Sequence, residues 1–194
     1  MRSLAPRFLL ALLGASLALG CSDGTSPSPT EAMRPAFKVG GRSGFGFNGS
    51  VKGFGIGEVR LTGGGSFDPA TANNTIPTLT TSVASAGGFD CTLAVGQGPL
   101  LGCGDGEGVR WDTVQLLQSN TFRCTTSEVV RPATTDDHTA VLLADFYRAG
   151  DGDEKSFTAQ MIVTDERDLD DDIPGIQNLW VQGVGCGTAI VNFN

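Results

Sequence analysis

The chain has 194 residues, of which 28 are glycine, and its formal net charge at pH 7 is −8. An acidic chain of this kind repels the phosphate backbone of nucleic acids, so the charge argues against nucleic acid as a partner. The single histidine and five cysteines leave few residues for histidine-based catalysis or zinc binding.

The first 20 residues have the pattern of a secretory signal peptide. Arg2 and Arg7 make a basic start, and the apolar run Phe8–Leu19 follows them. As a helix this run would reach only about 18 Å, which is short of the roughly 30 Å hydrocarbon core of a bilayer. We therefore predict that residues 1–20 direct export and are removed, and we leave them out of the fold.

The segment Leu17-Ala18-Leu19-Gly20-Cys21 resembles the lipobox of bacterial lipoproteins. In that family the cysteine thiol is acylated and the cysteine becomes the new N-terminus. The resemblance implies that Cys21 is the lipidation site and that a lipid anchor holds the exported protein on a membrane. In diderm members of this family an aspartate after the cysteine marks retention at the inner membrane. Ser22 stands at that position, so the resemblance implies the outer membrane or the cell surface.

Residues 21–35 connect this cysteine to the rest of the chain. Ser22–Pro35 is rich in serine, proline and threonine and has no hydrophobic period, which is typical of a flexible tether. Residues 36–194 remain, and their number is within the usual range for one domain with its own core. We predict a single β domain over residues 36–194.

The pattern of this domain predicts an all-β fold. In Ser156–Thr164, the residues Phe157, Ala159, Met161 and Val163 alternate with Thr158, Gln160, Ile162 and Thr164, which is typical of a strand with two different faces. Glycine-rich turns separate further candidate strands at Val51–Leu61, Phe89–Val95, Val109–Leu117, Thr139–Arg148 and Leu179–Phe193. Short strands with such turns indicate an antiparallel β-sandwich or a small barrel, here cross-linked by disulfides.

Three stretches are less regular. The pattern predicts a short helical turn at Gln115–Ser119 and a long loop or an edge strand at Thr71–Ala86. Gly44–Gly49 matches the GxGxxG dinucleotide fingerprint, but the glycine-rich Ser50–Gly57 follows it where the fingerprint needs a helix. We therefore interpret Gly44–Gly49 as a β segment that bends, or over which phenylalanine rings lie.

The four cysteines beyond Cys21 form an even set in an exported chain, which predicts two disulfides. No CxxC spacing supports a zinc site instead. The turn Gly96–Pro99 brings Cys103 back toward Cys91, so we predict the bonds Cys91–Cys103 and Cys124–Cys186. The competing pairing joins Cys91 to Cys124 and Cys103 to Cys186.

Two acidic runs offer the carboxylates that calcium prefers, Asp151–Glu154 and Asp165–Asp172. Neither run fits the EF-hand pattern. The strand between them would span about 30 Å, so they are expected at opposite ends of the domain. The second run is the stronger candidate for a weak calcium site, and its candidate ligands are Asp165, Asp168, Asp170 and Asp172. In the alternative interpretation both runs are solvated acidic turns, and the protein has no cofactor.

Other candidates for chemistry have plainer explanations. His138 lies in a polar turn and is expected to be an exposed loop residue rather than a catalytic base. Trp111, Tyr147 and Trp180 are the residues able to stack on a sugar or anchor a partner, but each lies within an apolar strand pattern and is expected in the core. We identify no catalytic residue.

Fold class and location predict a lipid-anchored protein of the cell envelope with a non-catalytic binding or structural β domain. The membrane is reached through the anchor, and the further partner is a protein or a glycan. One alternative is a secreted glycan hydrolase that uses paired carboxylates, because acids far apart in sequence can converge in space. A second alternative is a calcium-dependent adhesion domain.

Overall fold

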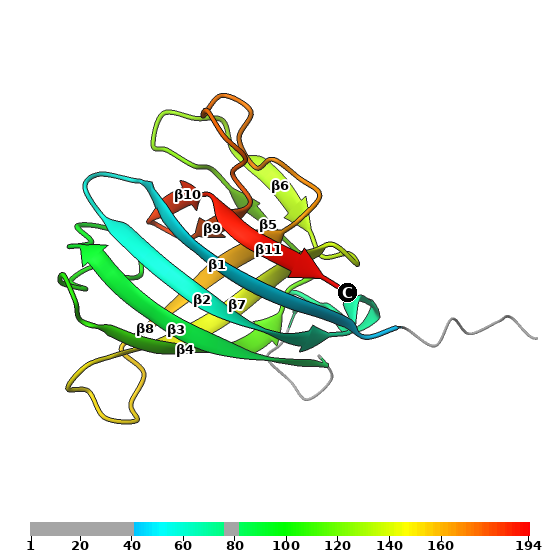
Figure 1. Cartoon of the computed structure of the whole chain (residues 1–194), viewed down its shortest axis with the longest axis horizontal. Helices are drawn as coiled ribbons and strands as arrows, with labels where there is room; N and C mark the ends of the chain where they lie inside the picture. The colour runs from blue at the N-terminus through cyan, green and yellow to red at the C-terminus, as the bar shows by residue number, and fades with distance from the viewer. Residues whose placement is uncertain (1–40, 76–81) are drawn as a thin grey trace, which may run out of the picture. The chain divides into compact units, whose positions relative to one another are not determined.

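The computed structural model describes residues 41–75 and 82–194, and nearly all of their regular structure is β-strand (Figure 1). The strands are β1 (Ser43–Gly53), β2 (Glu58–Phe67), β3 (Val83–Leu93), β4 (Gly108–Leu116), β5 (Ser119–Phe122), β6 (Arg131–Thr134), β7 (Thr139–Arg148), β8 (Phe157–Thr164), β9 (Leu179–Val181), β10 (Gly185–Gly187) and β11 (Ala189–Phe193). A short 3-10 helix, η1 (Pro69–Thr71), follows β2. The predicted signal peptide, residues 1–20, and the tether, residues 21–35, lie outside the described residues.

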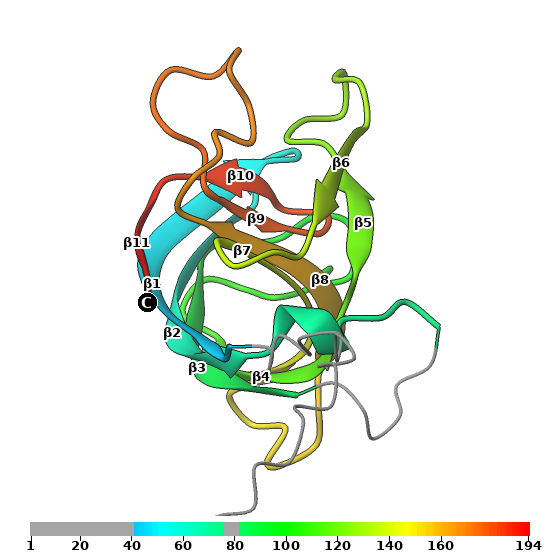
Figure 2. The same ribbon diagram turned by 90° about the vertical axis from the view of Figure 1, so that its right-hand side faces the viewer.

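Eight strands close into an antiparallel barrel, which decides between the two predicted architectures in favour of the small barrel. The order around the barrel is β1-β2-β3-β4-β7-β8-β9-β10, and β10 returns to β1 through the pairs Lys52↔Cys186 and Gly53↔Gly185. β11 continues beyond β10 and pairs with the first half of β1. The β5–β6 hairpin is inserted between β4 and β7 and forms a separate two-stranded sheet beside the ring of strands (Figure 2).

Alternating side chains fill the interior of the barrel. In β8, Phe157, Ala159, Met161 and Val163 contribute to the main core, which confirms the predicted faces of this strand. The largest rings in this core are Phe45, Phe47, Phe67, Phe89, Trp111 and Phe146. An eight-stranded barrel is just wide enough to be filled by side chains, so rings of this size leave a packed core inside it.

Loops close both ends of the barrel. Val95, Leu100 and Cys103 from the connection between β3 and β4 are buried in the main core. Cys103 is bonded to Cys91, with the two Cα atoms 6.1 Å apart, and Cys124 is bonded to Cys186. Both predicted disulfides are therefore confirmed. At the other end, Ala72 beside η1 packs against the same core.

Trp111 occupies its place in the core because two facing residues have no side chain. Its indole lies against Gly63 of β2 and Gly87 of β3, where a Cβ atom would overlap the ring. The indole N–H donates to the Thr62 carbonyl oxygen at 3.0 Å, so the buried polar atom is paired. Part of the glycine content is thus explained by the volume of one tryptophan.

The run Gly44–Gly49 forms part of β1, which confirms its interpretation as a β segment. Phe45 and Phe47 are buried in the core, and Gly44 and Gly46, which alternate with them, face the other side of the strand. The predicted single strand Val51–Leu61 is wrong, because the chain turns over at residues 54–57 between β1 and β2. Gly55 has a φ of +65° in this turn, a conformation that glycine adopts without strain.

Two further expectations differ from the structure. Gln115–Ser119 contains no helical turn: Leu116 pairs with Leu142 at the end of β4, and the Leu117 N–H donates to the Val141 carbonyl oxygen. Burial against β7 thus overrides the local helical preference. The end of Thr71–Ala86 belongs to β3, which lies between β2 and β4 and is not an edge strand. Residues 76–81 of that stretch are outside the described residues.

We expect Gly63→Ala to lower the free energy of unfolding by about 1–3 kcal/mol, the usual cost of overpacking a core. The added Cβ would overlap the Trp111 ring and lie 2.7 Å from the Ala86 carbonyl oxygen. Urea denaturation measures the change. Gly46→Ala is the matched control, because its nearest neighbour would be the Gly63 carbonyl oxygen at 3.9 Å. Equal unfolding midpoints for the two variants would contradict this account of Trp111.

Candidate functional site

The β5–β6 hairpin covers an apolar patch on the outside of the barrel. Val141, Ile162 and Trp180 point outward from β7, β8 and β9, and they form a second buried cluster with residues of the hairpin and its flanks, which are Leu117, Phe122, Cys124 and Ala133. The outward face of β8 is thus apolar at Ile162 because the hairpin shields it from water.

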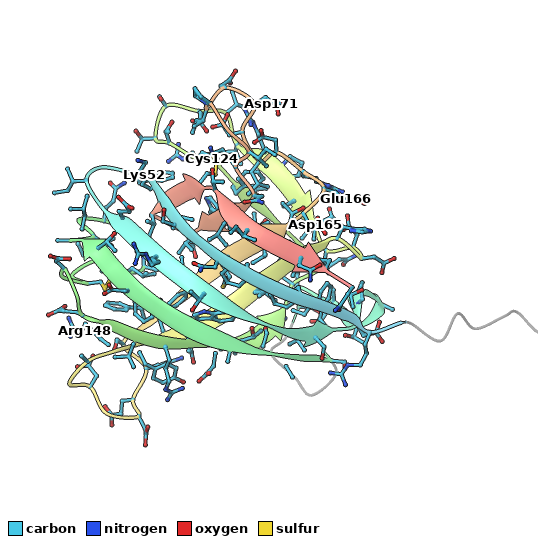
Figure 3. All side chains as sticks on the ribbon, in the orientation of Figure 1. Lys52, Cys124, Arg148, Asp165, Glu166 and Asp171 are labelled. Carbon is cyan, nitrogen blue, oxygen red and sulfur yellow. A yellow bond between two sulfur atoms is a disulfide. The ribbon has the colours of Figure 1, made fainter. Side chains whose placement is uncertain are left out.

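A disulfide and several hydrogen bonds attach the hairpin to the barrel and to the loop after β8. The disulfide Cys124–Cys186 joins the end of β5 to β10, with the Cα atoms 4.8 Å apart. The Trp180 indole N–H donates to the Arg123 carbonyl oxygen at 2.9 Å. Arg131, at the start of β6, donates to the Leu169 carbonyl oxygen at 2.7 Å. Cys124 lies close to β10 in Figure 3.

A groove runs along β5 where the hairpin meets β8 and β9. It consists of two hollows of about 490 and 690 Å³, which share Thr121 and Gln182. We call it the hairpin groove. Its amide end is lined mainly by Asn74, Ser119, Asn120, Thr134 and Gln160, and its apolar end mainly by Phe54, Pro99, Phe122, Arg123, Val130 and Trp180.

The amides of the groove hold one another in place. Asn120 Nδ2 donates to Gln160 Oε1 at 3.3 Å, and the Gln160 backbone N–H donates to Gln182 Oε1 at 3.1 Å. Asn120 Oδ1 is buried without a hydrogen-bond partner. Protein atoms enclose this acceptor, so a ligand in the groove does not reach it.

The backbone of Thr121 also faces the groove. The Thr135 N–H donates to the Gln118 carbonyl oxygen, which sets the alternation of the β5–β6 ladder. In an antiparallel ladder, hydrogen-bonded and non-hydrogen-bonded residue pairs alternate, and Thr121 and Pro132 form a non-hydrogen-bonded pair. Pro132 has no N–H, which agrees with this assignment. The N–H and C=O of Thr121 therefore point away from β6 and toward the groove.

A second groove lies between the β1–β2 turn and the loop after β8. It encloses about 790 Å³, with Lys52 and Thr188 among its polar residues and Ile56, Leu93 and Pro174 among its apolar ones. We call it the turn groove; Lys52 marks its position in Figure 3. Among residues 41–75 and 82–194, Glu58 is the one carboxylate that lines it, and none lines the hairpin groove. Neither groove therefore contains the carboxylate pair that glycoside hydrolysis uses.

The two acidic runs lie at opposite ends of the antiparallel pair β7–β8, as their spacing predicts. The first run follows Arg148 and the second begins with Asp165, and Figure 3 shows these two residues far apart. Within the second run, the four candidate calcium ligands turn to three partners, because Asp170 and Asp172 share Arg131. Asp165 accepts from His138, Asp168 from the Gln177 N–H, and Asp172 from Arg131.

Asp170, the fourth candidate, is fully buried beside Glu128 and Arg131, with Arg131 Nη2 at 3.3 Å. Oxygen atoms of Asp170 and Glu128 and the sulfur of Cys124 lie within 4.8 Å of one another, but this sulfur belongs to a disulfide and is no thiolate ligand. Burial raises the pKa of Asp170, and the neighbouring Glu128 raises it further. Burial also acts to raise the pKa of Glu128, but hydrogen bonds from Thr125 and the Cys124 N–H outweigh it and lower that pKa. Two carboxylates fall short of the six to eight oxygens that calcium takes.

His138 is exposed, as expected, and both ring nitrogens face carboxylates. Nδ1 lies 3.0 Å from Asp165 Oδ1, and Nε2 lies 3.2 Å from Glu166 Oε1. The hydrogen bond to Asp165 is the main cause that raises the pKa of His138. In the part of the chain that the structure describes, no serine or cysteine side chain hydrogen-bonds this ring, so the pattern of an activated nucleophile does not form around it.

Of the three candidate aromatic residues, two are in cores. Trp111 lies inside the barrel, and Trp180 lies beneath the hairpin next to Cys186. Tyr147 is only partly buried, and the Arg110 guanidinium lies 3.6 Å from the centre of its ring. Tyr147 is thus an outer-face residue with a cation–π partner, contrary to the core position expected for it.

No protein-family model, curated protein or solved structure matches this chain. Within the residues that the structure describes, no helix combines the length and the apolar character needed to cross a membrane.

The sequence analysis missed the hairpin groove. Asn120, Gln160 and Gln182 belong to separate segments that the barrel brings together, and no motif joins them. One signal was readable: the alternation of Ser156–Thr164 predicts that Gln160 faces away from the core, and it does.

We expect the single histidine to titrate above its ordinary pKa of 6.5, because the folded chain favours its charged form. The stability that it contributes is then present below pH 6.5 and is lost as the pH rises through the folded pKa. Proton NMR of the untagged protein follows this one ring directly. Asp165→Asn should bring the pKa back toward 6.5, and a wild-type midpoint at or below 6.5 would contradict the proposed pairing.

Proposed function

We propose that this protein is an exported, lipid-anchored binding module of the cell envelope, without catalytic activity of its own. The observation that carries the proposal is the hairpin groove, where the side-chain amides of Gln160 and Gln182 are held in fixed positions and their NH₂ groups donate to no other group among the described residues. The barrel interior is filled with side chains, so recognition falls to the outer surface.

The anchor and the location rest on the lipobox resemblance of residues 17–21 and on Ser22 after the cysteine. Two disulfides are compatible with an oxidising compartment outside the cytoplasm. The net charge of −8 is compatible with a soluble domain held at a surface by Cys21.

The two alternatives have less support. A glycan hydrolase would need two carboxylates converging in a cleft, and neither groove is lined by more than one. A calcium-dependent adhesion domain would need Asp165, Asp168, Asp170 and Asp172 to share one ion. Asp165 instead faces His138, Asp168 accepts from the Gln177 N–H, and Asp170 and Asp172 both face Arg131.

We expect a bacterium with two membranes to attach lipid to Cys21. Metabolic labelling with an alkyne fatty acid should tag the wild-type protein and leave Cys21→Ser unlabelled, because the variant has no thiol to acylate at this position. The labelled protein should fractionate with the outer membrane. Equal labelling of both proteins would contradict lipidation at Cys21.

The binding activity can be separated from both alternatives in one assay. The full chain carrying Cys21→Ser, exported so that its disulfides form, is mixed with cell envelopes from a strain that lacks the protein. We expect it to sediment with the envelopes and to release no reducing sugar ends, equally in calcium and in EGTA. Release of reducing ends would indicate the hydrolase, sedimentation only in calcium would indicate the adhesion domain, and no sedimentation would contradict envelope binding.

A further inference from the structure

We propose that the hairpin groove binds a neutral glycan chain, which the amide end recognises through hydrogen bonds to sugar hydroxyls. This inference rests on the proposed binding function and adds the class of its ligand. It depends on three properties of the groove: the uncharged lining of its amide end, its free hydrogen-bonding groups and its protected strand edge.

The amide end contains no charged side chain, although the whole chain has a net charge of −8. An anionic ligand would be repelled by the protein and would find no cation there. A cationic ligand would find no carboxylate. Arg123, at the apolar end, is placed with its guanidinium 5.7 Å from the centre of the Phe54 ring. The lining of the amide end thus favours an uncharged ligand.

The free groups at the amide end include both donors and acceptors. The side-chain NH₂ groups of Gln160 and Gln182 donate to no other group of the described chain. The N–H and C=O of Thr121 point into the same space. Because a sugar hydroxyl both donates and accepts, neighbouring hydroxyls of a glycan match such a set of amides.

An extended peptide fits this groove less well, because the free edge of β5 is already capped. Asn74 uses its side-chain amide to bond both the N–H and the C=O of Ser119, at 3.2 and 2.9 Å. The Trp180 indole bonds the Arg123 carbonyl oxygen. Only Thr121 remains for an added strand, whereas strand addition uses a row of backbone groups.

The apolar end completes the site. Pro99 and the half-exposed Val130 line it over the buried rings of Phe54 and Trp180. The C–H face of a sugar ring is apolar and packs on surfaces of this kind. Because the two ends share Thr121 and Gln182, one oligosaccharide can contact both.

Calorimetry with defined hexasaccharides tests the proposal. The protein is the full chain with Cys21→Ser, prepared without glycoside detergents. The probes are maltohexaose, cellohexaose and hexa-N-acetylchitohexaose, with hexagalacturonate as the anionic counterpart. We expect saturable binding of at least one neutral probe at millimolar concentration or below, and none of hexagalacturonate.

A groove variant then locates the binding. Gln160→Met removes the amide at similar volume and should weaken binding about tenfold, the equivalent of about 1.4 kcal/mol. Gln118→Met is the matched control, since this exposed glutamine is outside the groove and should leave affinity unchanged. Urea midpoints equal to that of the parent chain show that each variant folds.

Each contrary result has a separate meaning. No binding of any neutral probe, or equal binding of hexagalacturonate, would overturn the glycan inference. Binding that Gln160→Met leaves unchanged would overturn the assignment to the hairpin groove. In either case, sedimentation with envelopes would leave the proposed binding function in place, whereas loss of that sedimentation would remove the function itself.

Discussion

The fold depends on the close approach of β10 to β1, because this contact closes the barrel. β10 has only three residues, Gly185, Cys186 and Gly187. A Cβ on Gly187 would overlap the Ser50 carbonyl oxygen, and one on Gly185 would overlap the Lys52 carbonyl oxygen. Gly185 also has a φ of +127°, which residues with a side chain rarely adopt. The closing contact therefore requires glycine on both sides of Cys186.

The same contact positions the candidate site. Cys186 holds the hairpin through Cys124, and Trp180, its partner across β9–β10, bonds the Arg123 carbonyl oxygen. A two-stranded sheet such as β5–β6 is marginally stable alone, so its place on the barrel comes from these attachments. The disulfide closes a loop with a sequence separation of 62, which stabilises a fold by about 4 kcal/mol in the chain-entropy model. That is a large share of the roughly 5–15 kcal/mol typical of a domain.

Features that depend on residues close together in the sequence could be predicted from the sequence. Features that depend on the pairing of strands far apart in the sequence could not. The two faces of β8 and the Cys91–Cys103 hairpin are local. The choice between sandwich and barrel is not, since it depends on β1 meeting β10 from the far end of the chain. Leu93 shows that alternation can fail even within one strand. Its spacing places it on the same face as Cys91 and Val95, which are buried, but the register shift between β2 and β3 at Glu58/Val59 leaves Leu93 half exposed. The hairpin groove is the extreme case, because its amides come from segments that meet only after the hairpin docks.

Filling the barrel has a consequence for recognition. A hollow barrel can bind a ligand inside, but here the rings around Trp111 occupy that space, and a binding site must be built on the outside. Amides suit such a site in an acidic protein, because they add hydrogen-bonding capacity without adding charge. Asn120, Gln160 and Gln182 also restrain one another before any ligand arrives. A ligand then has less side-chain freedom to remove, so more of each hydrogen bond contributes to affinity.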